Sequence, residues 1–403
     1  MSPTNCLLCV NKHIIIIISN LTLFQPFSEP EWVPDWPNPS VKLGQVSGVA
    51  IDPSGHVLVF HRAANEWNDR TFNLHNVYQN IGEPPIPEPT ILVYNETGEL
   101  VDTWGQNLFH MPHGITVDNQ GNVWVTDVAL HQVFKFTPNE KKVPAVIMGQ
   151  KFEPGDDDQH YCKPTSVAVM SSGEFFVADG YCNARIIKYA PDGIKTILSP
   201  FSHSVCPIGL NLSFFFLKRR HFKGLFEVVF FFCTVSGTSQ YSLLVPHALT
   251  LAEDRGELCV ANRERGRVSC YSATDGTFRA SFSNWLLGQR LFSVAYSPLH
   301  GVYTPPTAPS APASPTGCSA SACSASRIAR YTVCIACIGY ELCVANRERG
   351  RVLCYSATDG TFRASFSNWL LGQRLFSVAY SPLHSVYSLV LVYIARYKMC
   401  IAR

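Results

Sequence analysis

The stretch MPHGITVDNQGNVWVTDVALHQVFKF, residues 111–136, alternates apolar and polar residues in three short runs separated by turn residues. This alternation is typical of strands with one buried face, and Asn or Gly between the runs suits tight hairpins. The stretch therefore predicts three antiparallel strands. Its Pro-His opening places the imidazole of His113 at the start of the first strand, where it is either a structural side chain or a ligand.

The same pattern recurs along the chain, which points to a repeat architecture. Two β-rich runs around a glycine-containing turn are found at 46–62, 111–127, 163–179 and 245–262. Pro112 and Pro164 occupy the same place in two of these repeats. Their separation is close to the ~40–50 residues of a β-propeller blade. We therefore expect an all-β chain with a β-propeller fold.

Composition and charge limit the classes of protein to consider. Of the 403 residues, 46% are hydrophobic and the net charge is +2, as in ordinary globular proteins. No basic stripe favours nucleic acid, and no uninterrupted apolar run reaches the ~18 residues of a spanning helix. The 15 cysteines point to an oxidising compartment or to metal binding.

Two anomalies divide the chain. Residues 205–237 are rich in Phe and lack the repeat pattern, and residues 257–300 recur at 341–384 with the single change of Ser269 to Leu353. We predict a leader or N-terminal extension at 1–39 and a propeller at 40–303, with 205–237 as an atypical insertion. A low-complexity linker at 304–340 and the duplicate with a tail at 341–403 follow.

Two histidines occupy matched positions in the repeats, His113 and His247, whereas the third repeat has Thr165 there. Corresponding positions of different blades converge on the central channel of a propeller. Two imidazoles in that channel could share one metal ion, most plausibly zinc. The alternative is that Pro-His merely begins a strand and that both side chains are structural.

Arg62 and Tyr181 are further candidates, each with a structural alternative. Arg62 ends an apolar strand in FHRAANEW and is either a salt-bridged edge residue or a clamp for a substrate carboxylate. Tyr181, in ADGYCNARI, either packs or serves as a base beside a metal.

Cysteine spacing favours disulfides over a metal cluster. Cys259 and Cys270 flank two strands joined by a turn, and Cys162 and Cys182 bracket the hairpin of the third repeat in a similar way. Both pairs are compatible with cross-strand disulfides.

Several stretches together closely resemble one enzyme family, the lyase domain of the peptide-amidating enzymes, peptidyl-α-hydroxyglycine α-amidating lyase. The matching stretches are GQVSGVAID, VFHR, PEPTILVYN, NLFHMPHGITVD, GNVWVTDVALHQVFKF, PGDDDQHYCKPTSVAV, FFVADGYCNARI and LCVANRERGRV. The resemblance implies a six-bladed propeller of NHL-type repeats. It also implies cleavage of a peptidyl-α-hydroxyglycine to a peptide amide and glyoxylate, the last step in neuropeptide amidation.

The resemblance assigns roles residue by residue. It implies zinc and structural calcium as cofactors and two disulfides that agree with the spacing. The residues are His113 and His247 for zinc; Tyr181, Arg62 and Arg263 for catalysis; the backbone carbonyls of Val49 and Ile115 for calcium; and the pairs Cys162–Cys182 and Cys259–Cys270 for the disulfides.

The chain also departs from the family pattern. The family's third zinc histidine lies in a late Pro-His-Asp motif whose Asp binds calcium, and no such motif follows residue 247. His300 and His384 lie in SPLH, which matches a different part of the repeat. We therefore expect an incomplete propeller of about five blades with an open edge, in which the zinc and calcium sites each lack one side chain.

The resemblance implies a monomer of the secretory pathway, in secretory granules or outside the cell, whose substrate comes from a separate monooxygenase. Two rival functions remain. One is an NHL-type propeller that has lost activity and serves as a binding module, which the missing third histidine favours. The other is a calcium-dependent lactonase, which would need Asp or Glu and Asn side chains in the channel.

Overall fold

The computed structural model describes the repeat region and parts of the duplicate. Its helical content is two single 3-10 turns, η1 (Glu253–Arg255) and η2 (Arg263–Arg265), and every other regular element described is a strand. No helix in this part of the chain is long and apolar enough to cross a membrane. The described residues are 37, 43–194, 243–283, 290–297, 341–346, 351–358, 360–367, 375–380, 389–393 and 399–402.

The strands form six antiparallel sheets. The first contains β1 (Val46–Ile51), β2 (Val57–His61), β3 (Ile91–Tyr94) and β4 (Leu100–Trp104). The second contains β5 (Pro112–Val117), β6 (Val123–Asp127), β7 (Gln132–Phe136) and β8 (Val146–Met148). The third contains β9 (Ser166–Val169), β10 (Phe175–Asp179) and β11 (Arg185–Tyr189).

The remaining sheets contain the C-terminal half of the described chain. The fourth contains β12 (Pro246–Ala252), β13 (Glu257–Asn262), β14 (Arg267–Ser272) and β15 (Phe278–Phe282). The fifth contains β16 (Leu291–Ser297), β17 (Glu341–Asn346), β18 (Arg351–Ser356) and β19 (Phe362–Ser367). The sixth contains β20 (Leu375–Tyr380), β21 (Leu389–Tyr393) and β22 (Met399–Ala402).

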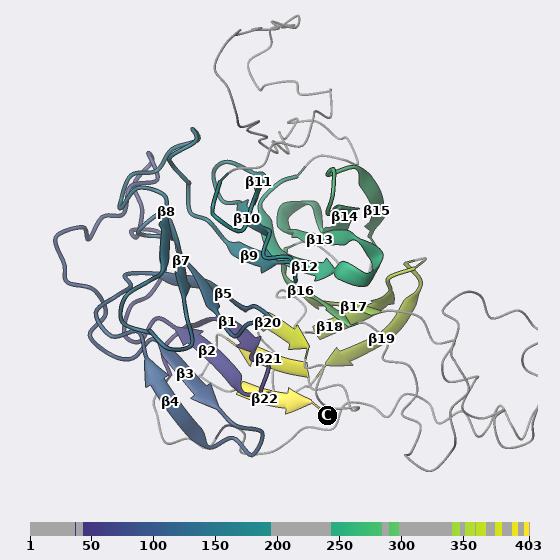
Figure 1. Ribbon diagram of the computed structural model, residues 1–403, viewed down its shortest axis with the longest axis horizontal. Helices are drawn as coiled ribbons and strands as arrows, with labels where there is room; N and C mark the ends of the chain where they lie inside the picture. Colours follow the sequence, from purple (N-terminus) through teal and green to yellow (C-terminus); the bar gives the residue numbers. More distant parts are fainter. Residues whose placement is uncertain are drawn as a thin grey trace, which may run out of the picture.

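The sheets radiate around a central axis as the blades of a propeller (Figure 1). The innermost strand of each sheet contacts the innermost strand of the next, in the order β1, β5, β9, β12, β16 and β20. Strand β20 contacts β1 in turn, so the ring is closed. The all-β propeller class is confirmed, with four sheets of four strands and two of three among the described residues. The expected open edge is not found, because the ring of inner strands is closed.

The duplicate explains this correction. Its first copy supplies β13 to β15 of the fourth sheet and then β16, the inner strand of the fifth. The second copy supplies β17 to β19 of the fifth sheet and then β20, the inner strand of the sixth. Because each copy begins in one blade and ends in the next, copying it advances the chain by one blade. The expected insertion at 205–237 and linker at 304–340 lie outside the described residues.

Turn chemistry fixes the hairpins between inner and second strands. Asp118 accepts hydrogen bonds from the backbone N–H groups of Gln120 and Asn122 at 3.0 and 2.9 Å, and Gly121 has a φ of +79°. A side-chain acceptor followed by a left-handed glycine is the expected solution for this turn. The turn closes the first hairpin of the stretch 111–136, where the sequence changes from alternation to Asp-Asn-Gln-Gly.

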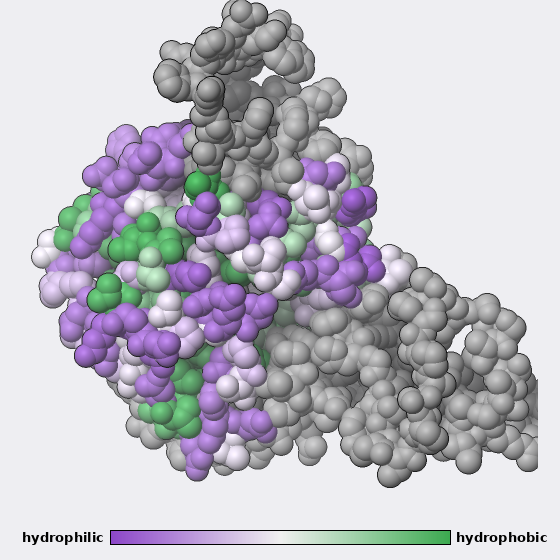
Figure 2. Space-filling view, in the orientation of Figure 1, coloured by the Kyte–Doolittle hydropathy of each residue, from purple (hydrophilic) through white to green (hydrophobic). Residues whose placement is uncertain are grey.

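Apolar side chains fill the spaces between adjacent sheets. Phe60 and Ile91 of the first sheet pack with Phe134 and Phe136 of the second, and these four side chains are 7% exposed or less. Similar clusters lie between the second and third sheets and between the fourth and fifth. On the face shown in Figure 2, the coloured residues are mainly polar, with separated apolar areas.

The inner strands of neighbouring sheets are not paired by a backbone ladder, but hydroxyl groups form hydrogen bonds between them. Thr116 of β5 donates to the carbonyl oxygen of Val167 in β9 at 2.7 Å. Ser293 of β16 accepts from the backbone N–H of Val378 in β20 at 3.2 Å. Buried backbone groups that lack such partners would destabilise the fold. These bonds therefore align the inner strands of neighbouring blades.

Both expected disulfides are present, Cys162–Cys182 and Cys259–Cys270. The copy of the second pair, Cys343–Cys354, forms a third. The repeat thus reproduces the covalent link of its blade as well as the strands.

Replacing Ile186 with Ala should lower the free energy of unfolding by about 2–5 kcal/mol, because the side chain is 0% exposed and packs between the third and fourth sheets. Leu74→Ala is the matched control, since Leu74 is 99% exposed. It should change stability by no more than about 0.5 kcal/mol. Urea unfolding measures both, and equal effects would contradict the assigned core.

Candidate functional site

The site lies where the inner strands begin at the mouth of the central channel. His113 in β5 and His247 in β12 each sit at an irregularity of strand pairing, after Pro112 and Pro246. An irregularity of this kind turns a side chain out of the regular alternation, and it is common beside active sites. Both imidazoles are buried, at 2% and 3% exposure, and their ring centroids lie 4.9 Å apart. The structure therefore brings together the two histidines that the repeats predict.

The phenol of Tyr181 lies between the two imidazoles. Its oxygen is 3.0 Å from Nε2 of His113 and 2.9 Å from Nε2 of His247. Tyr181 follows β10 in the third sheet, so three consecutive sheets contribute to one cluster. The convergence of the Nε2 atoms on one point is the main geometric feature of the site.

Backbone carbonyls fix the orientation of both rings. Nδ1 of His113 donates to the carbonyl oxygen of Thr165 at 2.9 Å, and Nδ1 of His247 donates to that of Phe292 at 2.6 Å. A proton on Nδ1 leaves the Nε2 lone pair of each neutral ring directed at the cluster. Burial lowers the pKa of His113 to about 3, with Arg62 adding to the effect, so this ring is neutral near pH 7.

The donor atoms of the cluster suit a cation. Two imidazole Nε2 atoms and one phenol oxygen converge on one point. Histidines whose Nδ1–H groups donate to carbonyls and whose Nε2 atoms converge are the arrangement that zinc sites use. The residues present therefore fit a zinc ion.

Arg62 lies beside His113 and is held by polar and aromatic contacts. Its Nε donates to the carbonyl oxygen of Pro112 at 2.9 Å, and one terminal nitrogen donates to Gln45 at 3.0 Å. The guanidinium lies 5.4 Å from the ring centre of Trp67. Trp67 in turn packs against Tyr181 at 4.9 Å between ring centroids. Arg62 is therefore in the site rather than on a sheet edge.

Arg263 approaches the same cluster from the fourth sheet. Its guanidinium is 5.6 Å from the ring centre of Tyr181 and 4.6 Å from that of Phe292. It also pairs with Glu264 at 3.3 Å. Two cationic groups thus lie close to the histidines, which suits an anionic ligand.

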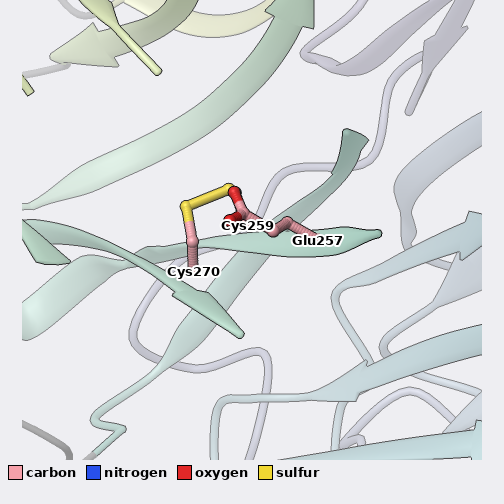
Figure 3. Close-up of side chains that lie close together, drawn as sticks. All are labelled: Glu257, Cys259 and Cys270. Carbon is pink, nitrogen blue, oxygen red and sulfur yellow. A yellow bond between two sulfur atoms is a disulfide. The ribbon is translucent and has the colours of Figure 1, made fainter. Parts of the chain in front are cut away.

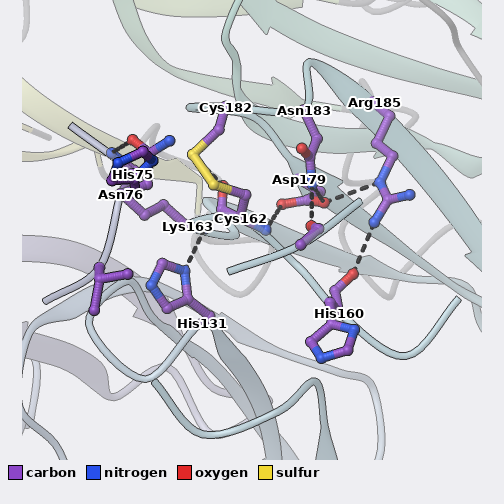
Figure 4. Close-up of a disulfide and its surroundings, with 12 residues drawn as sticks. His75, Asn76, His131, His160, Cys162, Lys163, Asp179, Cys182, Asn183 and Arg185 are labelled. Atoms are coloured by element: carbon purple, nitrogen blue, oxygen red, sulfur yellow. Dashed lines mark hydrogen bonds and ion pairs between the residues drawn. A yellow bond between two sulfur atoms is a disulfide. The ribbon is translucent and has the colours of Figure 1, made fainter. Parts of the chain in front are cut away.

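A buried network holds the loop that carries Tyr181 (Figure 4). Asp179, which is 0% exposed, accepts from the backbone N–H of Cys162, from Asn183 and from Arg185 at 2.7, 2.6 and 2.9 Å. The disulfide from Cys162 to Cys182 ties the loop at the residue next to Tyr181. The loop is therefore fixed by covalent and ionic contacts on both sides of the phenol.

His131 lies in the same region and is bonded to Lys163 (Figure 4). Its Nδ1 accepts from the backbone N–H of Lys163 at 3.0 Å, and its side chain is 0% exposed. Burial lowers the pKa of His131 to about 4, and the Lys163 ammonium adds to the effect. Between about pH 4 and pH 6.5, the imidazole of His131 is therefore mostly neutral in the folded chain, whereas it is mostly charged in the unfolded chain.

The predicted calcium positions lie in the channel. Val49 and Ile115 line a cavity of about 270 Å³, which is open to solvent and lined by residues of the inner strands of the six sheets. The described lining contains carbonyl and hydroxyl oxygens but no carboxylate. Calcium prefers several oxygen ligands, usually with carboxylates among them. Calcium at Val49 and Ile115 stays a prediction, and an ion there would be held by neutral oxygens of these residues.

One other group of metal-type ligands is excluded as a metal site. Glu257 lies close to Cys259 and Cys270 (Figure 3). Both sulfur atoms are joined in a disulfide, so neither is a thiolate that could bind a metal. This group is structural.

Phe292 in the fifth sheet and Phe376 in the sixth occupy the position that His113 occupies in the second sheet. Each lies at an irregularity of pairing, between Leu291 and Ser293 in β16 and between Leu375 and Ser377 in β20. The two SPLH histidines lie outside the described residues. Sequence reasoning did not assign Trp67 or Gln45 to the site, and only the position of Trp67 near Arg62 in FHRAANEW offered a signal.

Comparisons with known proteins agree with this architecture. The NHL repeat family model matches residues 109–136 and 161–189, which contain strands β5 to β7 and β9 to β11. The Drosophila melanogaster protein "Peptidyl-alpha-hydroxyglycine alpha-amidating lyase 1" is 44% identical over 279 residues, covering 68% of this chain and 47% of that protein. The corresponding lyase 2 is 43% identical over 247 residues, covering 60% and 52%.

The Xenopus laevis protein "Peptidyl-glycine alpha-amidating monooxygenase B" is 41% identical over 266 residues, covering 66% of this chain and 27% of that protein. The chain thus spans about half the length of the fly relatives and about a quarter of the frog relative. The resemblance seen in the sequence motifs is confirmed.

The lowered pKa of His131 should make the free energy of unfolding depend on pH. Between its folded pKa of about 4 and the ordinary value of 6.5, the unfolded chain binds the proton and the folded chain does not. Stability therefore rises with pH across this window, with up to about 1.4 kcal/mol per pH unit from this group. His131→Asn, which suits the φ of +56° at this position, should flatten the slope by that amount.

His160→Asn is the control for this measurement. The hydrogen bond to Asp157 raises the pKa of His160. The contribution of His160 to the free energy of unfolding is therefore constant below pH 6.5 and is lost only as the pH rises through the raised pKa. Urea unfolding between pH 4 and 6.5 should give the parent slope for His160→Asn. An unchanged slope in His131→Asn would contradict a buried neutral imidazole.

Proposed function

We propose that this chain, a homologue of the peptidyl-alpha-hydroxyglycine alpha-amidating lyases, is itself such a lyase. It would cleave a peptidyl-α-hydroxyglycine to a peptide amide and glyoxylate. The observation that supports the proposal beyond homology is the convergence of His113, His247 and Tyr181, with Arg62 and Arg263 beside them. The histidines, the guanidinium groups and the phenol would each act on a different group of the substrate.

His113 and His247 would hold zinc through their Nε2 atoms, since the Nδ1–H groups are used by the carbonyls of Thr165 and Phe292. A bound zinc ion supplies Lewis acidity that lowers the pKa of a hydroxyl group. The two protein ligands leave positions open for the substrate.

Arg62 and Arg263 would bind the α-carboxylate of the hydroxyglycine, because the Arg263 guanidinium lies beside Tyr181 and the Arg62 guanidinium beside His113 and Trp67. Bound in this way, the carboxylate would place the adjacent hydroxyl group close to the phenol oxygen. Trp67 and Phe292 would exclude water on either side of the substrate.

Tyr181 would act as the base. In its phenolate form it would take the proton of the substrate hydroxyl. The C–O bond becomes the aldehyde C=O of glyoxylate as the C–N bond breaks, and the electron pair of that bond goes to the amide nitrogen. The nitrogen then takes one proton, so the products are the peptide amide and glyoxylate with no change of oxidation state overall.

A second candidate is a catalytically impaired NHL-type propeller that serves as a binding module. Phe292 and Phe376 at the matched positions favour it, because a third imidazole is absent from both. In that case the two histidines and the hydroxyl-lined cavity would serve recognition alone.

The proposed setting is the secretory pathway, in granules or outside the cell, with the chain acting as a monomer. The three disulfides are compatible with it. The substrate would come from a separate monooxygenase, the activity named in the frog relative. Zinc and structural calcium are the proposed cofactors.

Glyoxylate release from a short peptidyl-α-hydroxyglycine tests the assignment. With zinc supplied, the parent chain should release glyoxylate, and Tyr181→Phe should lower kcat about 100- to 10,000-fold through loss of the base. Tyr94→Phe removes the same hydroxyl from a tyrosine buried in the first sheet and should leave kcat within about twofold. Zinc binding without glyoxylate release by the parent would favour the binding module.

In a secretory host, Asn95 should carry an N-linked glycan. The sequence Asn95-Glu96-Thr97 forms the turn between β3 and β4, and the hydroxyl of Thr97 donates to the Asn95 side chain at 2.8 Å. Glycosidase treatment should increase the mobility of the purified chain on a gel. Thr97→Ala should abolish that component of the shift and Thr97→Ser should keep it, whereas a shift unchanged in Thr97→Ala would exclude Asn95.

A further inference from the structure

Thr165 occupies the position in the third sheet that His113 and His247 occupy in the second and fourth. It lies directly before β9, and its side chain is 1% exposed. The repeats alone suggest only that this position tolerates a residue other than histidine. The contacts of Thr165 show that it touches both histidine-bearing strands.

The backbone carbonyl of Thr165 is the acceptor for Nδ1 of His113, at 2.9 Å. Its hydroxyl donates to the carbonyl oxygen of Pro246, the residue before His247, at 2.8 Å. A second carbonyl, that of Ala178, lies 3.2 Å from the hydroxyl but already accepts the backbone N–H of Thr165 at 2.8 Å. One residue thus links the ring of one histidine to the backbone that carries the other.

Two glycines allow this close approach. A Cβ at Gly114 would lie 2.3 Å from the carbonyl oxygen of Thr165. A Cβ at Gly180, which precedes Tyr181, would lie 2.1 Å from the carbonyl oxygen of Pro246 and 3.1 Å from Cγ2 of Thr165. The strand of His113, the loop of Tyr181 and the strand of His247 therefore all pack directly around Thr165.

We propose that Thr165 is a positioning residue that sets the separation and orientation of the two imidazoles at the candidate zinc site. This inference rests on the proposed function for the identity of the metal. Residues that orient metal ligands typically contribute about 10- to 100-fold to metal affinity or activity when replaced. Thr165 would act through His113 and His247 and would not touch the substrate.

Thr165→Val tests this role, because it keeps the shape and the backbone carbonyl but removes the hydroxyl donor to Pro246. Zinc affinity, measured by competition with a chelator, should fall about 10- to 100-fold. Thr165→Ser, which keeps the hydroxyl, should restore most of the affinity.

Thr116→Val is the matched control. The hydroxyl of Thr116 also donates to a carbonyl of the next inner strand, that of Val167 at 2.7 Å, but this bond does not join the histidines. Thr116→Val should lose about as much thermal stability as Thr165→Val. It should keep zinc affinity within about threefold, because the Thr116 hydroxyl makes no hydrogen bond to either histidine or to Pro246. Equal losses of affinity in the two variants, or none in Thr165→Val, would overturn the proposal.

A metal-free readout separates this proposal from the proposed function. In NMR spectra of the chain labelled with ¹⁵N-histidine, the parent should show His113 and His247 protonated at Nδ1, and Thr165→Val should shift or broaden these resonances while Thr116→Val leaves them unchanged. Failure of the parent to bind zinc, with these shifts present, would refute the zinc assignment and keep Thr165 as the residue that orients the pair. Unshifted resonances in Thr165→Val would refute the role of Thr165 whatever the metal.

Discussion

The candidate site depends on how the inner strands of neighbouring blades are held together. They belong to different sheets, so no backbone ladder aligns them, and their buried polar groups need partners from the next blade. Hydroxyl and imidazole side chains supply these partners, from Thr116 to Val167, from His113 to Thr165 and from His247 to Phe292. The two imidazole bonds among them also direct the Nε2 atoms of His113 and His247 at one point. These two bonds therefore serve both the structure and the candidate chemistry.

Much of this arrangement could be predicted from local patterns. Alternation and turn residues indicate the strands, and matched Pro-His pairs indicate the two histidines, because both signals lie within one repeat. Ring closure could not be predicted in the same way. The partner of β16 is β17, which follows it only after a long stretch of other sequence, so their pairing depends on long-range packing. The contact between Trp67 and Tyr181 is equally non-local.

The duplicate supplies a blade but no third histidine. Its boundaries lie inside blades, so the second copy enters the ring in phase and β20 reaches β1. Both copies, however, carry Phe at the register position of the histidines, as Phe292 and Phe376. The chain thus combines a closed scaffold with a ligand set of two imidazoles and one phenol.

In the proposed site, His113 and His247 bind one zinc ion and Tyr181 lies between them. Zinc K-edge X-ray absorption of the chain loaded with one equivalent of zinc tests this arrangement. We expect scattering from two imidazoles at about 2.0–2.1 Å, with oxygen in the remaining positions and no sulfur. The imidazole contribution should fall by half in His247→Ala. Sulfur scattering at about 2.3 Å, or a spectrum unchanged in that variant, would contradict a zinc site made by these two histidines.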